Sequence, residues 1–420
     1  MKRSYAVAFE KDIFFRLPKE CENRILAYLS LPELCRSLST CSKRTKALVY
    51  AAKYWKEVCI RGMQNSCSVG LLRLHGRHFE KIKLHSMRIS RVFCNGLSSC
   101  SNLQELDLRG IWKSSVVNNN FIASLSKLPL RVLLFGKNEV GSNGFQRICH
   151  QFANTMEEFD FNSKLVPLRS YYCLSKMKRL RCLTLRCCNH LDHTVVPMLA
   201  LLTDLRTLQL SFLSHMSPMC VEAIVQSALC TQLETLVLNG MYLNDYHCQL
   251  LNRMVSLRQL SLCHPNMNSN VLEHVCLPEL QLLTIFCSKH LRNFAFLKGL
   301  PKLMTLCLFR CAISVSSLLE NTEQRPKLAV KVHLIQDLCE GCAVPQRVYK
   351  EKLSKAKNVS YLNLVTRPYP FVYFSRLNKI VLLSISFVVF DKFIIQAFFL
   401  FRTDLVTFAK VKRNGRGSFQ

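Results

Sequence analysis

Glycine and proline are scarce in this sequence, and their scarcity bounds the class of protein. Each accounts for 13 of the 420 residues, whereas 49% of the residues are hydrophobic. Disordered and low-complexity chains are rich in glycine and proline and poor in apolar side chains. The sequence therefore predicts a folded protein with a large core.

Catalytic and targeting motifs are also missing. The sequence holds no GxSxG, no phosphate-binding glycine-rich loop and no HExxH, so the commonest hydrolase, nucleotide and zinc-peptidase signatures are absent. Its first residues, MKRSYAVAFEKDIFF, lack the long apolar run and small-residue cleavage site of a signal peptide. We expect a protein of the cytosol or nucleus.

Cysteine use agrees with that compartment. The 22 cysteines are scattered, which is typical of reduced thiols rather than a disulfide framework. The isolated pair Cys339 and Cys342 is interpreted as loop or repeat filler, with redox or metal use as the alternative. Several other cysteines occupy apolar positions, among them Cys182, Cys263 and Cys307.

Acidic residues are few as well. The chain has 27 Asp and Glu against 57 Lys and Arg, a formal net charge of +30. The excess is spread along the whole chain, whereas a nucleic-acid-binding protein concentrates basic side chains on one face. A solvated basic surface is the default interpretation, and no nucleic acid is expected as a partner.

What the sequence does contain is a repeated Leu-x-x-Leu-x-Leu pattern. With its first apolar residue as position n and the others at n+3 and n+5, the pattern recurs every 23 to 30 residues. Pattern and spacing resemble a leucine-rich repeat, in which each unit is one strand and one helix. The frames begin at Phe79, Leu103, Leu130, Met156, Leu180, Leu205, Leu233, Leu257, Leu280, Leu303, Ala329 and Val359.

The resemblance implies an α/β solenoid, with a curved parallel sheet inside and helices outside. Apolar groups such as Val196, Leu199 and Leu202 fit the outer helix. Charges nearly balance at the concave positions n+2, n+4 and n+6, which carry Lys81, Lys83, Arg109, Arg186 and Lys331 against Glu105, Asp107, Glu158 and Asp160. A basic row stands at n+1, formed by Arg131, Arg181, Arg206 and Arg258, and an acidic partner along that rim is an alternative to a solvated surface.

The stretch LRCLTLRCCNHLDH, residues 180–193, raises the question of a zinc site. Its thiols and imidazoles fall close together at Cys187, Cys188, His190 and His193. Zinc sites usually draw ligands from two separated pairs, and no clear second pair lies beside this one. In the repeat frame, Cys188 and Cys311 occupy n+8, where such repeats carry Asn or Cys that contacts loop backbone. We therefore expect a structural role and no metal.

Residues 17–34, LPKECENRILAYLSLPEL, precede the repeats and have apolar residues at the spacing of two short helices. With a third helix expected over residues 41–54, they form a helical module of about fifty residues. A module of that size is barely stable alone and is suited to dock on a partner.

The order and spacing of motifs in this module resemble an F-box. The matching residues are Leu17-Pro18-x-Glu20, Ile25-Leu26-x-Tyr28-Leu29, Pro32-Glu33-Leu34, Cys41 before a basic helix, and Tyr54-Trp55-Lys56. Two positions depart from the family pattern. Arg44 replaces the usual aromatic residue three positions after the cysteine, and Glu22 stands where an apolar residue is common.

An F-box followed by leucine-rich repeats is the arrangement of a family of ubiquitin-ligase substrate receptors. The resemblance implies that the module binds a Skp-type adaptor, joins a cullin–RING ligase, and presents a protein substrate held by the repeats. The resemblance also implies that the chain is not an enzyme and holds no cofactor. No catalytic residue is required, because a ubiquitin-conjugating enzyme supplies the reacting cysteine. Adaptor contacts, or the core of the module itself, would come from Leu17, Pro18, Ile25, Leu26, Leu29 and Leu34.

Two other functions stay open. Arg44 suggests a scaffold that resembles this family but assembles no ligase, and the total charge suggests a basic repeat protein that binds RNA or acidic membrane lipid.

The domains expected are an extension (1–16), the F-box-like module (17–64), a solenoid of about twelve repeats (65–364) and an apolar, basic tail (365–420). Residues 380–401 have the length of a membrane span, but Asp391 and Lys392 stand at its centre, where each is costly. We expect the tail to cap the last repeat. A membrane anchor and an atypical tail are the alternatives.

The concave positions change from charged to apolar along the array. Since exposed apolar patches often mark interaction sites, we expect the substrate to contact Leu282, Phe286, Phe309 and Ile335, joined by Tyr361 if the last frame holds. The alternatives are that residues at n+6 turn into the core, or that the tail covers the patch.

Overall fold

The computed structural model describes the repeat region almost continuously. The chain divides into two units, residues 1–365 and 366–420, and the described residues all belong to the first. They are residues 18, 20, 21, 24, 26, 55–62, 65–111, 119–213, 216–263, 269–288, 291–309, 311–323, 325–334 and 359–363.

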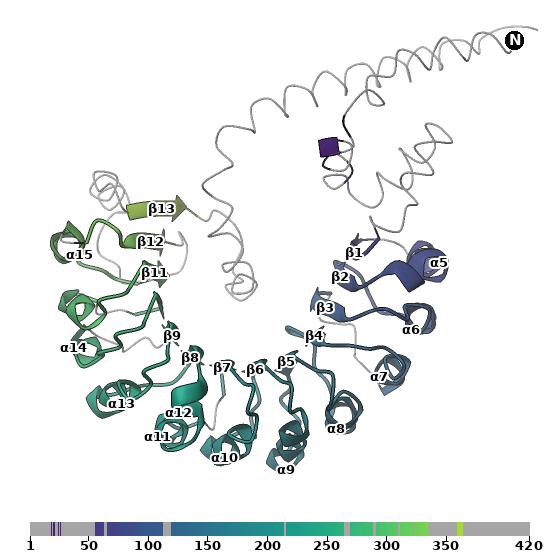
Figure 1. Cartoon of the computed structure of the whole chain (residues 1–420), viewed down its shortest axis with the longest axis horizontal. Coiled ribbons are helices and arrows are strands. Elements are labelled where there is room, and N and C mark those ends of the chain that lie inside the picture. The colour runs from purple at the N-terminus through teal and green to yellow at the C-terminus, as the bar shows by residue number, and fades with distance from the viewer. Residues whose placement is uncertain are drawn as a thin grey trace, which may run out of the picture. The chain divides into compact units, whose positions relative to one another are not determined.

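The described strands form one parallel sheet whose spatial order equals their order in the sequence (Figure 1). Each strand pairs with the next, which is the arrangement expected for stacked repeats. The 13 strands are β1 (Glu57–Arg61), β2 (Lys81–His85), β3 (Glu105–Gly110), β4 (Val132–Leu134), β5 (Glu158–Asn162), β6 (Cys182–Arg186), β7 (Thr207–Ser211), β8 (Thr235–Asn239), β9 (Gln259–Cys263), β10 (Leu282–Phe286), β11 (Thr305–Phe309), β12 (Ala329–Leu334) and β13 (Val359–Asn363).

Helical segments return the chain from one strand to the next and lie on the outer side of the arc (Figure 1). The α-helices are α5 (Asn65–His75), α6 (Arg91–Leu97), α7 (Asn119–Ser124), α8 (Ser142–Gln151), α9 (Leu168–Tyr171), α10 (Val196–Leu199), α11 (Met219–Gln226), α12 (Leu229–Gln232), α13 (Asp245–Leu251), α14 (Ser269–Glu273) and α15 (Val315–Glu323). The 3-10 segments are η4 (Gly76–His78), η5 (Tyr172–Lys176), η6 (His193–Val195) and η7 (Ala295–Gly299). A parallel sheet inside and helices outside confirm the solenoid expected from the repeat.

Strand pairing aligns the frames one to one, so that residues at n+3 form a continuous apolar row inside the solenoid. Burying each such side chain contributes roughly 1.5–3 kcal/mol, and only a neighbouring repeat can cover it. This register confirms the ten frames from Phe79 to Leu303. The row consists of Ile82, Leu106, Leu133, Phe159, Leu183, Leu208, Leu236, Leu260, Leu283 and Leu306, all at most 1% exposed.

A further repeat precedes the first expected frame. Val58 pairs with Ile82 in the sheet, so a frame begins at Trp55, inside the segment assigned to the helical module. Trp55 is 1% exposed. Its ring stacks on His75 with centroids 4.2 Å apart and packs near Phe79 at 6.0 Å. The sheet therefore starts at β1, ahead of the boundary expected at residue 65.

The two frames expected at Ala329 and Val359 are wrong in register. Val330 lies opposite Leu306 and Val359 lies opposite Val330, so these frames start two and three residues earlier than expected. The reason is that Val330, rather than Val332, continues the buried row.

Each strand ends in a turn that the sequence supports locally. Backbone φ is positive just after the strand at several equivalent positions, including Cys187 (51°) and Gly240 (90°), which lets the chain leave the sheet sharply. One residue later, the Cys188 thiol donates to Arg186 O at 3.3 Å, and the Cys311 thiol donates to Ile285 O at 3.4 Å. These bonds confirm the structural role expected of n+8.

Several expectations fall on residues that the structure does not describe. Leu17, Ile25, Leu29 and Leu34 lie outside the described residues, as do Arg44, Glu22, Ile335, the pair Cys339 and Cys342, and the whole tail with residues 380–401. Within the described ranges, no helix combines the length and apolar character that crossing a bilayer requires.

Candidate functional site: the concave face of the sheet

Two side-chain rows of different chemistry cover the concave face. All acidic residues at the described concave positions lie on β1 to β6. From β7 to β11 the concave face carries neither acidic nor basic residues, but hydroxyl, amide, thiol and apolar side chains. We call the charged set the N-terminal concave patch; it consists of Glu57, Arg61, Lys81, Lys83, Glu105, Asp107, Arg109, Glu158, Asp160 and Arg186.

The charges of the N-terminal concave patch are largely paired with one another. Lys83 forms an ion pair with Glu57, and Lys81 forms one with Glu105. These pairs join neighbouring strands, since the lysines lie on β2 and the carboxylates on β1 and β3. The patch is therefore a network that is already largely neutralised before any ligand arrives.

Two arginines hold the buried carboxylates of this patch. Arg109 binds Asp107 with both ends of its guanidinium, Nε to Oδ1 at 2.9 Å and Nη2 to Oδ2 at 2.7 Å. Arg186 Nη1 lies 2.8 and 2.7 Å from the two oxygens of Asp160. Charge-assisted bonds of this kind fix the geometry of both partners.

Burial and these arginines act in opposite directions on the carboxyl pKa values. Burial alone would raise the pKa of Asp107, but the hydrogen bonds and charge of Arg109 outweigh it, so this pKa is lowered. Burial raises the pKa of Asp160, and Arg186 offsets only part of the rise. Burial also raises the pKa of Glu158, which forms no ion pair within the described residues.

Two of the four predicted substrate contacts come together at the other end of the sheet, and a third lies on one of the same strands. Phe286 on β10 lies opposite Phe309 on β11, and their rings stack with centroids 4.7 Å apart and planes 13° apart. Leu282 starts the same strand and is half-buried. We call Leu282, Phe286 and Phe309 the C-terminal concave patch.

Exposure within this patch is uneven. Phe286 is 8% exposed, whereas Phe309 is half-buried and presents more of its ring. The predicted fourth contact, Ile335, lies outside the described residues, and Tyr361 pairs with Val332 instead of continuing the row of Phe309. Whether a substrate binds here stays a prediction.

The basic row at n+1 is interrupted by acidic residues. Glu157 stands between Arg131 and Arg181 in the hydrogen-bonded ladder of the strand starts, and Glu234 stands between Arg206 and Arg258. Arg131 Nη2 lies 2.6 Å from Glu157 Oε1. The row is thus a mixed ladder, and it gives an acidic partner less attraction than four adjacent arginines would.

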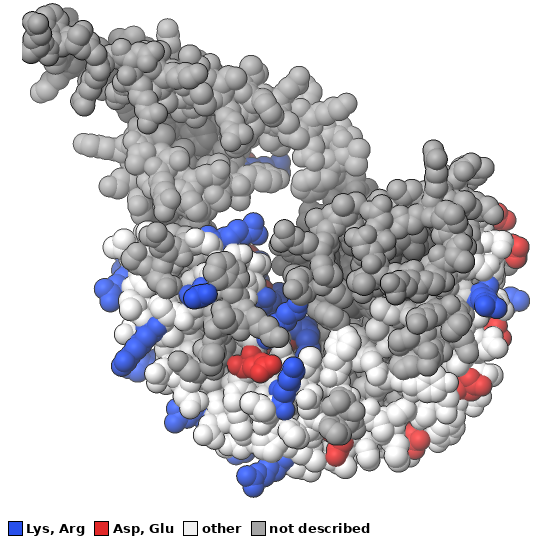
Figure 2. Space-filling view, turned by 180° about the vertical axis from the view of Figure 1, so that it is seen from behind, with Lys and Arg blue, Asp and Glu red and all other residues white. Residues whose placement is uncertain are grey.

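Figure 2 shows how charge is distributed on one face of the molecule. Lys and Arg gather mainly over the half of the solenoid that carries the N-terminal repeats, and Asp and Glu lie mainly over the other half.

The thiols and imidazoles of residues 187–193 do not converge. Cys188 is fully buried, and burial raises its pKa to about 11, which disfavours the thiolate that metals bind. His190, two residues later, is exposed on the loop. Within the described residues, no three His, Cys, Asp or Glu side chains come close enough to hold a metal ion.

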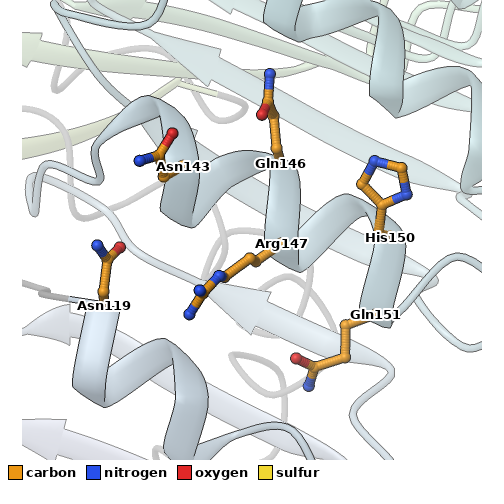
Figure 3. Close-up of a pocket in the computed structure, with 6 residues that line it drawn as sticks. All are labelled: Asn119, Asn143, Gln146, Arg147, His150 and Gln151. Carbon is orange, nitrogen blue, oxygen red and sulfur yellow. The ribbon is translucent and has the colours of Figure 1, made fainter.

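A polar groove on the convex side was not expected from the sequence. It has a volume of about 560 Å³ and lies between α7 and α8 (Figure 3). Amphipathic spacing on α8 was the one available signal, since polar residues recur there every three or four positions. The lining residues are Asn119, Asn143, Gln146, Arg147, His150 and Gln151.

Comparison with family models gives no match, and comparison with curated proteins gives none either. Solved structures of similar fold include Rad7, from the yeast complex of Rad7 and Elc1, at 13% identity and a TM-score of 0.46, covering 78% of this chain and 97% of that one. An internalin, InlF, of Listeria monocytogenes is 15% identical with a TM-score of 0.39, covering 72% and 95%. A leucine-rich-repeat protein of Leptospira interrogans is 15% identical with a TM-score of 0.33, covering 66% and 90%.

The type of repeat can be identified from the structure itself. Parallel strands follow one another in sequence order, buried residues recur at n, n+3 and n+5, and an outer helical segment closes most repeats. With this repeating unit and spacing, the chain is a leucine-rich-repeat protein.

Proposed function

We propose that this protein is the substrate-recognition subunit of a cullin–RING ubiquitin ligase. The observation that carries the proposal is the pairing of an F-box-like segment, residues 17–64, with a leucine-rich-repeat solenoid directly after it. The order of motifs in that segment is specific, and repeat solenoids are non-catalytic surfaces for binding other proteins. The function then requires a docking face at one end and a substrate surface at the other.

Docking to a Skp-type adaptor falls to the apolar residues of the F-box-like segment. Among the two that the structure describes, Leu26 is 1% exposed and Pro18 is exposed. This contrast favours Leu26 as a core residue of the module and Pro18 as part of its docking face. Leu17, Ile25, Leu29 and Leu34 are proposed to divide between the same two roles.

Substrate binding is assigned to the C-terminal concave patch. Aromatic side chains are enriched among the residues that carry most of the binding energy at protein interfaces, and the stacked pair Phe286 and Phe309 offers a flat apolar surface. The neighbouring concave positions on β7 to β9 are uncharged, so an apolar substrate element meets no desolvated charge there.

The mechanism is then one of proximity. The chain contributes no reacting group; it holds the substrate while the cullin brings a ubiquitin-conjugating enzyme within reach. Positioning of this kind raises the effective concentration of a substrate lysine at the thioester. Specificity depends on the concave surface, and the rate depends on how the complex orients the lysine.

The test is a pull-down from cells with the full chain and its Leu17→Ala, Pro18→Ala double variant. We expect the wild type to recover a Skp-type adaptor and a cullin, and the double variant to lose both because the docking face loses apolar contact. Leu201→Ala, at a 54% exposed leucine of the solenoid, is the matched control and should recover both. A wild-type chain that recovers no adaptor, under conditions where a known F-box protein does, overturns the proposal.

A scaffold that assembles no ligase is the second candidate, and Arg44 is the sequence feature that favours it. The same pull-down separates the two, since a scaffold would retain its substrate-side partners without cullin. Binding to RNA or acidic lipid is less favoured, because the charge of the described rim alternates with Glu157 and Glu234 instead of forming a continuous basic stripe.

A further inference from the structure

Two cysteines lie on the convex side of consecutive repeats, on segments that pack against each other. Cys149 lies on α8 and is fully buried, whereas Cys173 lies on η5 and is partly exposed. The two segments pack against each other along their length. Neither thiol is in a disulfide.

Hydrogen bonds tie α8 to the neighbouring segment on both sides of the two cysteines. On one side Ser142 Oγ lies 2.9 Å from Ser170 Oγ. On the other side Lys176 Nζ lies 3.2 Å from His150 Nδ1. These bonds hold together the two segments that carry the cysteines, and the two thiols interact with each other.

The environments of the two sulfur atoms differ, and they shift the pKa values of the two thiols in opposite directions. A hydrogen bond from Cys149 lowers the pKa of Cys173 against the effect of burial, and the charge of Lys176 adds to the lowering. Burial holds the pKa of Cys149 well above its ordinary value. Cys173 is therefore the accessible thiol that ionises, and Cys149 is the protected thiol beside it.

Other buried thiols of the repeats lack this arrangement. Burial raises the pKa of Cys220 and of Cys248 to about 12, and that of Cys307 to about 11. Such thiols are inert packing residues. The pair on α8 and η5 combines solvent access, a nearby cation and a second thiol, which are the three features of a redox-sensing cysteine with its resolving partner.

We propose that Cys173 and Cys149 form a thiol-oxidation site for hydrogen peroxide, and that oxidation joins consecutive repeats by a disulfide. The Cys173 thiolate attacks one peroxide oxygen, the O–O bond breaks, and hydroxide leaves, which gives a sulfenic acid at Cys173. The Cys149 sulfur then attacks the Cys173 sulfur. The S–O bond breaks, and the hydroxyl leaves as water with the proton of the Cys149 thiol. The two thiols supply the two electrons that reduce the peroxide.

The site goes beyond substrate recognition, because it lies on the convex side and does not involve the concave residues. The disulfide would covalently link α8 to η5, whereas hydrogen bonds and packing hold α8 to α9 and η5 in the reduced protein. Its effect on the chain is thus local to two repeats and reversible by thiol reductants.

The site can be tested directly on the purified full chain. Reduced protein is exposed to hydrogen peroxide, its free thiols are blocked with N-ethylmaleimide, and the unreduced digest is analysed by mass spectrometry. We expect a peptide pair linked through Cys149 and Cys173 that disappears after reduction. In Cys149→Ser, the sulfenic acid at Cys173 should persist and be trapped by dimedone, because the resolving thiol is gone.

Cys67→Ser is the matched control, since Cys67 is an exposed thiol on α5, away from α8 and η5 in the repeat order. This variant should form the linked peptide to the same extent as the wild type. Lys176→Met should slow dimedone labelling of the Cys149→Ser protein. The proposal is overturned if both cysteines carry maleimide at peroxide doses that already oxidise Cys67, or if Cys173 is oxidised to higher acids without a bond to Cys149.

Discussion

At the scale of single residues, the pair formed by Asp160 and Arg186 is the most sensitive to substitution. Asp160 is 3% exposed although its strand faces the concave side. A carboxylate so buried is tolerable only because Arg186 binds both of its oxygens. Removing the arginine leaves a buried charge without that partner, and among the described residues the nearby Arg109 is already engaged with Asp107.

We therefore expect Arg186→Gln to lower the free energy of unfolding by about 3 kcal/mol at pH 7. Burial raises the folded-state pKa of Asp160 above its unfolded value, and the substitution raises it further. The folded protein then binds more protons than the unfolded one between these two pKa values, so the destabilisation shrinks as pH falls through the raised pKa. Urea unfolding of variant and wild type at pH 7 and pH 5 measures the difference.

Arg181→Gln is the control for that experiment. Arg181 is exposed at the start of the strand that carries Arg186, so its loss should change stability by less than about 0.5 kcal/mol at either pH. An equal destabilisation by Arg186→Gln at pH 7 and pH 5 would contradict the assignment of the cost to the Asp160 charge.

The stacked rings of the C-terminal concave patch allow a second prediction at residue scale. If substrate binding uses this surface, Phe286→Ala and Phe309→Ala should each weaken it by about 2 kcal/mol, with the larger loss at the more accessible Phe309. Substrates identified by proximity labelling are compared for retention by wild type and variants, and adaptor binding reports intact folding. Tyr172→Ala, at a 51% exposed aromatic residue on the convex side, should leave retention unchanged. Full retention by the double variant rules this patch out.

At the scale of elements, glycines mark where neighbouring repeats approach most closely. A Cβ built on Gly299, at the end of η7, would lie 2.4 Å from the backbone oxygen of Val275. Backbone cannot move aside as a side-chain end can, so the two repeats would have to separate. Gly70 within α5 has no atom within 4 Å of its built Cβ.

This contrast predicts that replacing glycine by alanine changes the free energy of unfolding in opposite directions at the two positions. Gly299→Ala should destabilise the protein by about 1–3 kcal/mol through steric overlap. Gly70→Ala should stabilise it by about 0.5–1 kcal/mol, since alanine restricts the unfolded chain and favours the helix. Thermal unfolding of both variants beside the wild type gives the two shifts. A stabilising Gly299→Ala would show that the contact between η7 and the segment at Val275 is loose.

The sequence was sufficient for the elements whose positions depend on periodicity alone. Rows at n+3 and n+5, the outer helical segments and the turn role of Cys188 follow from apolar spacing within one repeat. The frame at Trp55 was missed because Trp-x-x-Val-x-Ile coincides with the F-box-like motif. Register at β12 failed because Val330 and Val332 are both apolar, and spacing alone does not choose between them.

Contacts between repeats could not be predicted from the sequence, for a different reason. Asp160 and Arg186 are 26 positions apart, and their pairing depends on the exact alignment of β5 with β6. The contact between Cys149 and Cys173 depends in addition on how α8 and η5 are rotated about their axes. Local patterns determine which face a residue occupies, whereas its partner on that face depends on the stacking of whole repeats.

At the scale of the whole molecule, a repeat at an end of the solenoid differs from an inner repeat in what covers its core. Each inner repeat is covered on both sides, but the first must be covered by something outside the regular array. The described solenoid begins at Trp55. Its ring covers His75 and the core near Phe79, and β1 pairs with β2. The residues that complete the F-box-like motif therefore also begin the solenoid.

Two truncations separate these roles. A chain without residues 1–54 keeps Trp55 and β1, so we expect its repeats to unfold at nearly the wild-type urea midpoint while adaptor binding is lost. A chain without residues 1–64 also loses β1, which uncovers Phe79 and the edge of β2. Removing a buried tryptophan alone costs about 3–5 kcal/mol, and an uncovered strand edge invites association. The longer truncation should therefore unfold at lower urea and elute as aggregates in size-exclusion chromatography. Equal midpoints for the two chains would mean that β1 is dispensable and that the solenoid begins at β2.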